Sequence, residues 1–158
     1  MKVFVTGAAG FAGQSVVREL LEKKYSVRAL IRQTSAPEEW KSQGVEVVQG
    51  DLTQPESLKG KLDGCGAVIN LAGRLVERGE QTFHRLYFEG TRNLVESALS
   101  AGIKRFVHMS ALGARPAAAS RYHLANYMAE QIITDAPVIQ TIFRPSVIFG
   151  PGSRFCRL

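Results

Sequence analysis

The segment Gly7-Ala8-Ala9-Gly10-Phe11-Ala12-Gly13 joins a short apolar run, Lys2–Thr6, to an amphipathic run over residues 11–24. Such glycines either seat a phosphate group or only turn the chain tightly between a strand and a helix. In a phosphate seat, Gly7 turns the chain, Gly10 lets backbone N–H groups approach the ligand, and Gly13 lets the helix pack on the strand. The positive end of the helix dipole adds to the attraction. Because the glycines stand between a strand and a helix, as the motif requires, we favour the phosphate seat.

Apolar runs of strand length alternate with helical patterns along the chain. The expected strands span residues 2–6, 26–31, 45–48, 67–71, 105–109 and 139–143, and the expected helices span residues 11–24, 82–101 and 121–133. The polar loop 33–44 has room for a short helical turn. Short strands that are almost entirely apolar are typical of a parallel sheet with helices on both faces. The sequence therefore predicts an α/β, three-layer Rossmann fold, with a doubly wound parallel sheet of about six strands and a ligand beyond their carboxyl ends.

Charge and composition narrow the possible functions. The chain has 158 residues and a net charge of +6, but its 20 Lys and Arg are scattered and form no basic helical stripe with interleaved aromatics. We therefore predict no nucleic-acid partner. No apolar run approaches the roughly 18 residues of a membrane span, and no cluster of ligating residues points to a metal. Met1 leads directly into the first strand, so we expect no signal peptide. Cys65 and Cys156 are too few for a disulfide framework, so we expect a reducing, cytoplasmic location.

Several motifs stand where one enzyme superfamily carries them. They are Thr6-Gly7-x-x-Gly10-x-x-Gly13, Gly50-Asp51-Leu52-Thr53, Asn70-Leu71-Ala72-Gly73, the run over residues 90–98 with the strand that follows it, and Arg144-Pro145 followed by Gly150-Pro151-Gly152. On these motifs the chain resembles the short-chain dehydrogenase/reductase superfamily, in its extended or atypical branch of NAD-dependent epimerase/dehydratase-like proteins. The resemblance covers almost the whole chain. Within the superfamily, the chain is similar in particular to the nucleotide-binding accessory subunit of respiratory complex I. It implies a dinucleotide cofactor.

The resemblance also implies which residues contact this cofactor. Asp51 would face the adenine amino group and Leu52 would pack on its ring, while the segment that starts at Asn70 would line the ribose on the nicotinamide side. The cofactor-binding residues predicted in this way are Gly7, Ala9, Gly10, Phe11, Gly13, Arg32, Asp51, Leu52, Leu71, Ala72, Gly73, Ser110, Tyr122, Asn126 and Pro145.

The end of the second strand indicates which dinucleotide binds. It reads Ile31-Arg32-Gln33, and no carboxylate follows until Glu38. A carboxylate here would bind the ribose 2′-hydroxyl of NAD, whereas a guanidinium can bind a 2′-phosphate through two hydrogen bonds. We therefore expect NADP(H) to be favoured over NAD(H). The alternative is that Arg32 only stacks on adenine or faces the solvent.

The catalytic residues implied by the resemblance are incomplete. Active members of the superfamily use a Tyr as general acid and a Lys one helical turn later, whose charge lowers the Tyr pKa. Tyr122 stands at the Tyr position, but Asn126 stands at the Lys position, where it can hydrogen-bond a ribose yet carries no charge. Ser110 is the candidate catalytic hydroxyl or, alternatively, a structural strand-end residue that contacts the cofactor. His123 or Arg121 is a less favoured substitute for the missing charge.

Other polar and aromatic residues are expected to have structural roles. Tyr87 stands where relatives often carry Asn. His84 and His108 have no partner at metal-ligand spacing, so both are interpreted as packing residues. Glu77, Glu80 and Glu89 are interpreted as solvated helix positions.

We divide the chain into an NAD(P)-binding Rossmann domain, residues 1–150, and the start of an absent substrate-binding part, residues 151–158. The leading hypothesis is a dinucleotide-binding protein of the atypical short-chain reductase class with weak or no turnover. The alternatives are an active NAD(P)-dependent reductase or sugar-nucleotide epimerase/dehydratase that uses Tyr122, and a structural nucleotide-binding subunit of a larger assembly. An absent substrate-binding part would leave apolar sheet surface exposed, which predicts a second copy or a partner chain at the open edge.

Overall fold

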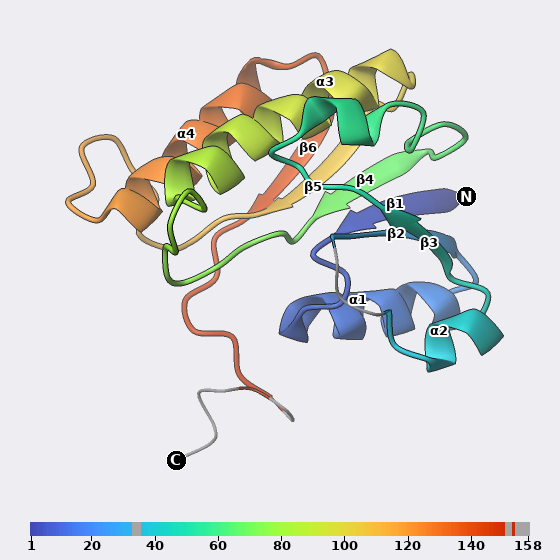
Figure 1. The fold of residues 1–158 in the computed structure, drawn as a ribbon. Helices are drawn as coiled ribbons and strands as arrows, with labels where there is room; N and C mark the ends of the chain where they lie inside the picture. The colour runs from blue at the N-terminus through green and yellow to red at the C-terminus, as the bar shows by residue number, and fades with distance from the viewer. Residues whose placement is uncertain (33–35, 151–152, 154–158) are drawn as a thin grey trace.

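The computed structural model describes residues 1–32, 36–150 and 153, and its centre is one parallel sheet of six strands (Figure 1). The strands are β1 (Lys2–Thr6), β2 (Ser26–Ile31), β3 (Glu46–Gln49), β4 (Ala67–Asn70), β5 (Arg105–Met109) and β6 (Ile139–Phe143). Their spatial order is β3-β2-β1-β4-β5-β6, and every neighbouring pair is parallel. The predicted doubly wound Rossmann fold is confirmed.

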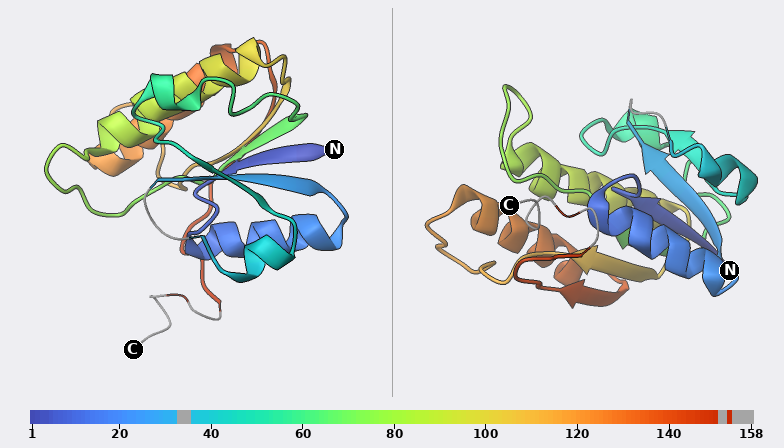
Figure 2. Two further views of the ribbon diagram at one scale, coloured as in Figure 1. Left: turned by 45° about the vertical axis from the view of Figure 1, so that its right-hand side comes forward. Right: turned by 90° about the horizontal axis from the view of Figure 1, so that it is seen from below.

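Helices cover both faces of the sheet and complete the three layers (Figure 2). On one face lie α1 (Phe11–Glu22) and α2 (Glu39–Ser42), and on the other lie the 3-10 turn η1 (Pro55–Leu58), α3 (Gly90–Ser100) and α4 (Arg121–Asp135). The single helix predicted over residues 82–101 is wrong in one respect, because its first part is a π-helical segment, η2 (His84–Glu89). None of the described helices has both the length and the apolar character needed to span a membrane.

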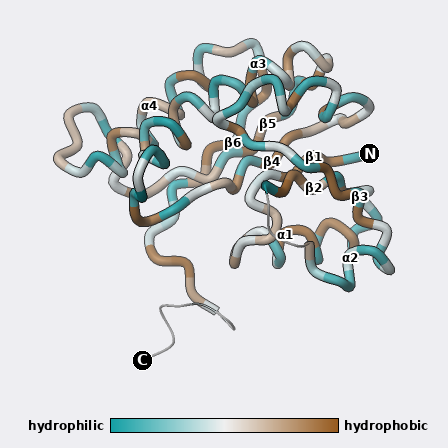
Figure 3. The backbone as a smooth tube through the Cα atoms, viewed as in Figure 1, coloured by the Kyte–Doolittle hydropathy of each residue, from teal (hydrophilic) through white to brown (hydrophobic). Residues whose placement is uncertain are grey.

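The two faces of the sheet carry separate hydrophobic cores, because side chains alternate along each strand. Phe4 of β1 packs beneath α3 in one cluster with Leu94. Its neighbours Val3 and Val5 point to the opposite face and pack in a second cluster with Trp40 of α2. Burial on both faces explains why β1 is so apolar, as the brown colour along β1 and β2 in Figure 3 shows.

The topology places a switch point between β1 and β4. After β1 the chain crosses one face of the sheet through α1, and after β4 it crosses the other face through α3. The strand order reverses at this point, so the loops that follow β1 and β4 lead to opposite faces of the sheet, and the region between these loops at the carboxyl ends of the strands is called the crevice below. Open α/β sheets bind their ligands at this switch point.

Strand β6 forms an edge of the sheet with exposed apolar side chains. Ile139 and Phe143 are 59% and 56% exposed, and Phe149, beyond the strand, is 73% exposed. Apolar surface is thus exposed where the sequence predicts it, while the chain that would cover it stays a prediction. The predicted start of a substrate-binding part, residues 151–158, lies outside the described residues except for Ser153.

Candidate functional site

The glycine turn between β1 and α1 is packed tightly around two of its glycines and open around the third. Gly7 has a φ of +65°, and a Cβ atom on it would lie 2.5 Å from the carbonyl of Leu71. A Cβ atom on Gly13 would lie 2.1 Å from the Gly7 oxygen. Gly10 is exposed, and a Cβ atom there would meet only the Gly7 oxygen, at 3.1 Å. Packing therefore requires Gly7 and Gly13, whereas Gly10 leaves its backbone open to a ligand.

The start of α1 offers unpaired donors beside this glycine. Gly10 is the N-cap residue and supplies no side chain to cap the helix. The first N–H groups of a helix have no acceptor within it, so they point out of the turn together with the positive end of the dipole. Gln14 Nε2 donates to the Ala9 carbonyl at 3.0 Å and holds the turn in place. This arrangement fits a pyrophosphate group.

Asn70, at the end of β4, holds together the two loops that border the crevice. Its Oδ1 accepts the hydroxyl proton of Thr6 at 2.6 Å and the backbone N–H of Ala72 at 3.4 Å. Its Nδ2 donates to Thr91 Oγ1 at 3.3 Å and lies 3.2 Å from His108 Nδ1. Because Asn70 is only 2% exposed, it positions the Ala72 backbone rather than contacting a ligand itself.

His108 of β5 is the packing residue that the sequence predicts, with 1% of its surface exposed. Burial lowers the pKa of its imidazole to about 4, against a smaller opposing effect of the Glu130 charge. Since Nδ1 accepts a hydrogen bond from Asn70, the ring proton of the neutral form is on Nε2. Nε2 has no hydrogen-bond partner among the described residues. The imidazole is therefore held neutral beneath the crevice.

A pocket of about 730 Å³ lies at the carboxyl ends of β2 and β3. It is lined by Arg32, Gln49, Gly50, Asp51, Gln54, Ser57, Lys61 and Gln81. Asp51 Oδ1 accepts hydrogen bonds from the N–H and the hydroxyl of Thr53, both at 2.9 Å. Arg32 and Lys61 form no ion pair within the described part of the chain, so this pocket is lined by two cations that no carboxylate contacts directly.

One residue of this pocket was not predicted, and one predicted residue near it is buried. Lys61 was missed, because it follows η1 in a turn that carries no recognisable motif. Leu52, which the resemblance places on the adenine ring, is 4% exposed and packs in the core beneath Gly90 of α3. Its contact with adenine stays a prediction.

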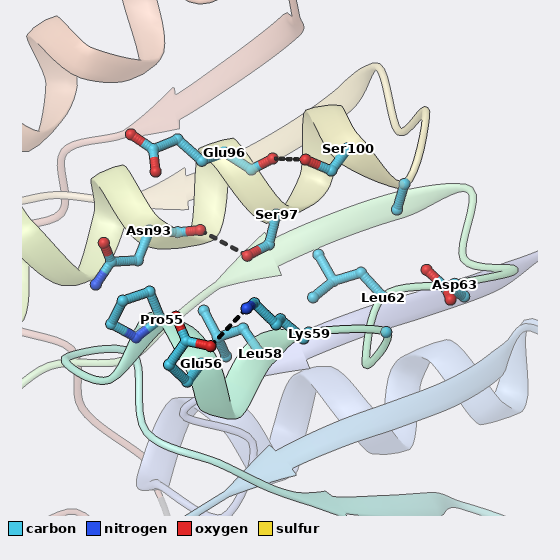
Figure 4. Close-up of a pocket in the computed structure, with 12 residues that line it drawn as sticks. Pro55, Glu56, Leu58, Lys59, Leu62, Asp63, Asn93, Glu96, Ser97 and Ser100 are labelled. Carbon is cyan, nitrogen blue, oxygen red and sulfur yellow. Dashed lines mark hydrogen bonds and ion pairs between the residues drawn. The ribbon is translucent and has the colours of Figure 1, made fainter.

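A second hollow, of about 300 Å³, lies between η1 and α3 (Figure 4). Its polar groups bind one another: Lys59 Nζ lies 2.6 Å from Glu56 Oε2, and Ser97 Oγ donates to the Asn93 carbonyl at 2.8 Å. None of its lining residues follows the carboxyl end of a strand. We therefore assign ligand binding to the crevice and to the pocket that contains Arg32.

Tyr122 and Asn126 lie one turn apart on α4. The Tyr122 ring packs edge-on against Phe83 and Tyr87, with a centroid distance of 5.5 Å to each. Asn126 is fully buried, and its Nδ2 donates to the Tyr122 carbonyl at 2.8 Å. Its Oδ1 has no hydrogen-bond partner among the described residues. The amide thus turns toward its own helix, and its contact with a ribose stays a prediction.

Ser110 belongs to a partly buried polar cluster that sequence reasoning did not assemble. Its hydroxyl donates to Glu130 Oε1, and Glu130 is only 2% exposed. Arg144 binds the same carboxylate through Nε, at 2.9 Å, and Nη2, at 2.5 Å, and this contact raises the pKa of Arg144. The cluster joins the end of β5 to α4 and to the residue after β6. Nearby, the Leu112 N–H donates to the carbonyl of Pro145, a predicted cofactor residue, at 2.9 Å.

The match to known proteins agrees with this geometry. Residues 7–149 match the family described as NAD(P)H-binding. The chain belongs to this family. It is 35% identical over 150 residues to the ceramide reductase of Caulobacter vibrioides, which covers 95% of the chain and 47% of that relative. It is 32% identical to an uncharacterized sugar epimerase of Bacillus subtilis, over 92% of the chain and 71% of the relative.

A solved structure supports the same membership in the NAD(P)H-binding family. A short-chain dehydrogenase/reductase superfamily protein from Agrobacterium tumefaciens, with bound NAD, matches with a TM-score of 0.74 and 26% identity, over 91% of the chain and 48% of that protein. The chain is thus an atypical, epimerase-like member of the short-chain dehydrogenase/reductase group, as its motifs predict. The finer likeness to the complex I accessory subunit stays a prediction. The chain spans about half the length of the ceramide reductase, at 47%.

Proposed function

We propose that the chain binds NADP(H) in preference to NAD(H). The support is the pair of cations, Arg32 and Lys61, that line the pocket at the ends of β2 and β3 and have no ion-pair partner among the described residues. A phosphate monoester carries about two negative charges and three acceptor oxygens, which such a pair would bind strongly. Asp51, the carboxylate of the pocket, is engaged by Thr53.

Replacing Arg32 by Ala is expected to weaken NADPH binding about tenfold and to leave NADH binding within about twofold, because only the phosphate contact is lost. Nicotinamide fluorescence measures both affinities. Lys59→Ala is the matched control, since Lys59 is exposed, pairs with Glu56 and lies outside the pocket. Equal wild-type affinities for NADH and NADPH, with NADPH affinity unchanged in Arg32→Ala, would contradict the proposal.

We further propose that the chain has weak or no turnover by itself. Asn126 stands one turn from Tyr122, and it is neutral and buried. The hydroxyl proton of Ser110 is donated to Glu130 and is not available to a substrate oxygen. Positioned acid and base groups typically contribute about a hundred- to ten-thousandfold to a rate, so the absence of these groups would lower the rate strongly.

The competing candidate is an active reductase or epimerase that works through Tyr122, and the name of the ceramide reductase relative favours it. With NADPH and a panel of ketones, we expect cofactor oxidation to be slow or absent, and any measured rate to disappear in Tyr122→Phe. Tyr127→Phe, on the same helix, is the control and should keep the rate. A Tyr122-dependent rate near the enzyme median of about 10 s⁻¹ would replace the weak-turnover proposal with this candidate.

A partner at the β6 edge is the third part of the proposal. The exposed side chains of Ile139 and Phe143 support it, because a sheet edge with large apolar side chains favours pairing with another chain. The partner is either a second copy of this chain or a subunit of a larger assembly.

A further inference from the structure

The hydroxyl group of Tyr87 binds the backbone of the loop that follows β4. It accepts a hydrogen bond from the Arg74 N–H at 2.9 Å and donates one to the Arg74 carbonyl at 2.8 Å. Tyr87 is 5% exposed, and burial raises the pKa of its hydroxyl, so the group stays protonated and able to donate. A Cβ atom on Gly73 would lie 2.9 Å from this hydroxyl oxygen, so the close approach depends on glycine.

The loop held by Tyr87 is one wall of the crevice. Residues 71–74 follow β4, and the backbone of Leu71 and Ala72 lies directly against Gly7 of the glycine turn. A dinucleotide that passes the glycine turn from the Arg32 pocket must extend beyond β4, along this wall. The half of the cofactor that meets residues 71–74 is therefore the nicotinamide half.

Tyr87 reaches this loop from an unusual helical segment. It lies within η2 (His84–Glu89), whose π-helical winding is rare and is frequent at functional sites among the cases known. Its ring also packs edge-on against Tyr122, at 5.5 Å between centroids. One side chain thus contacts both the crevice wall and the candidate general acid.

We propose that Tyr87 is a positioning residue for the nicotinamide half of the cofactor site, because its hydroxyl fixes the backbone of residues 71–74. The proposal requires dinucleotide binding but not a preference for NADP(H). It is therefore independent of the roles proposed for Arg32 and Lys61.

The test is Tyr87→Phe, which removes the hydroxyl and keeps the ring packed against Phe83 and Tyr122. We expect about tenfold weaker binding of the reduced dinucleotide, whichever of NADPH and NADH the wild type binds more tightly, because residues 71–74 lose both hydrogen bonds to Tyr87 and the ligand must then order them on binding. Binding of adenosine diphosphate, which has no nicotinamide half, should stay within about twofold. Amide exchange at residues 71–74 should become faster. Tyr25→Phe, beyond α1, is the control.

A purely structural role would reduce the affinity for both ligands together, or for neither, and either result would overturn the proposal. If Tyr87→Phe fails to fold, Gly73→Ala provides a second test, because its methyl group would displace the Tyr87 hydroxyl. We expect the same selective loss of dinucleotide affinity. If Tyr87→Phe folds, adding Gly73→Ala to it should lower the dinucleotide affinity little further, since the clashing oxygen is gone.

Discussion

Gly13→Ala is expected to destabilise the domain by about 3 kcal/mol or more, which corresponds to a fall in Tm of roughly 10 °C for a chain of this size. The new methyl group would lie 2.1 Å from the Gly7 oxygen and 2.5 Å from the Ala8 oxygen. Both are backbone atoms, so no side-chain rotation relieves the clash. Helix α1 would have to move away from β1, and the core beneath it, including Val17, would open.

Gly10→Ala is the matched comparison. Its methyl group would meet only the Gly7 oxygen, at 3.1 Å, and a change from Gly to Ala at an N-cap costs about 1 kcal/mol at most. We therefore expect this variant to fold and to bind the dinucleotide less tightly, because the methyl group occupies the approach of the phosphates. Thermal unfolding and a titration with NADPH separate the two effects. Wild-type Tm in Gly13→Ala, or wild-type affinity in Gly10→Ala, would contradict the role assigned to that glycine.

The fold was predictable from sequence because strands that are buried on both faces consist almost entirely of apolar residues. β1, β2, β5 and β6 begin and end at the predicted residues, and β3 is displaced by one residue. The break in the helix at η2 was not predictable, since its local sequence is compatible with an ordinary helix. Tyr87 contacts Arg74, thirteen residues away, and such tertiary contacts leave no local pattern.

The site residues were predictable where a sequence motif directly follows a strand. They were not predictable where segments that are distant in the sequence meet. Gly10, Asp51 and Ala72 lie at the carboxyl edge of the sheet, as expected from their motifs. Lys61 reaches the Arg32 pocket through a turn without a motif. The expectation that Glu77 is a solvated helix position is wrong: it precedes η2, accepts the Phe83 N–H at 2.8 Å and pairs with Arg121.

Acidification is expected to remove about 3 kcal/mol of stability through His108, between pH 6.5 and pH 4. Burial holds the folded-state pKa at about 4, below the ordinary value of 6.5, so the unfolded chain binds the proton first as the pH falls. The stability that the neutral His108 contributes is therefore complete above pH 6.5, falls between pH 6.5 and pH 4, and changes no further below pH 4. The proton would enter at Nδ1, where it would face the Asn70 amide and break their hydrogen bond.

His108→Asn isolates this effect, because it keeps a hydrogen-bonding atom near the Nδ1 position and cannot titrate. Urea unfolding from pH 7.5 to 4 measures the free energy of unfolding of the wild type and of the variant. We expect the wild type to lose about 3 kcal/mol more than the variant over this range, whatever their difference at pH 7.5. His84→Asn, at an exposed imidazole, is the control for removing a histidine. Parallel curves for the wild type and His108→Asn would show that the buried imidazole does not set the acid limit. Since Asn70 also holds the Ala72 N–H, loss of this network in acid would loosen the crevice wall as well as the core.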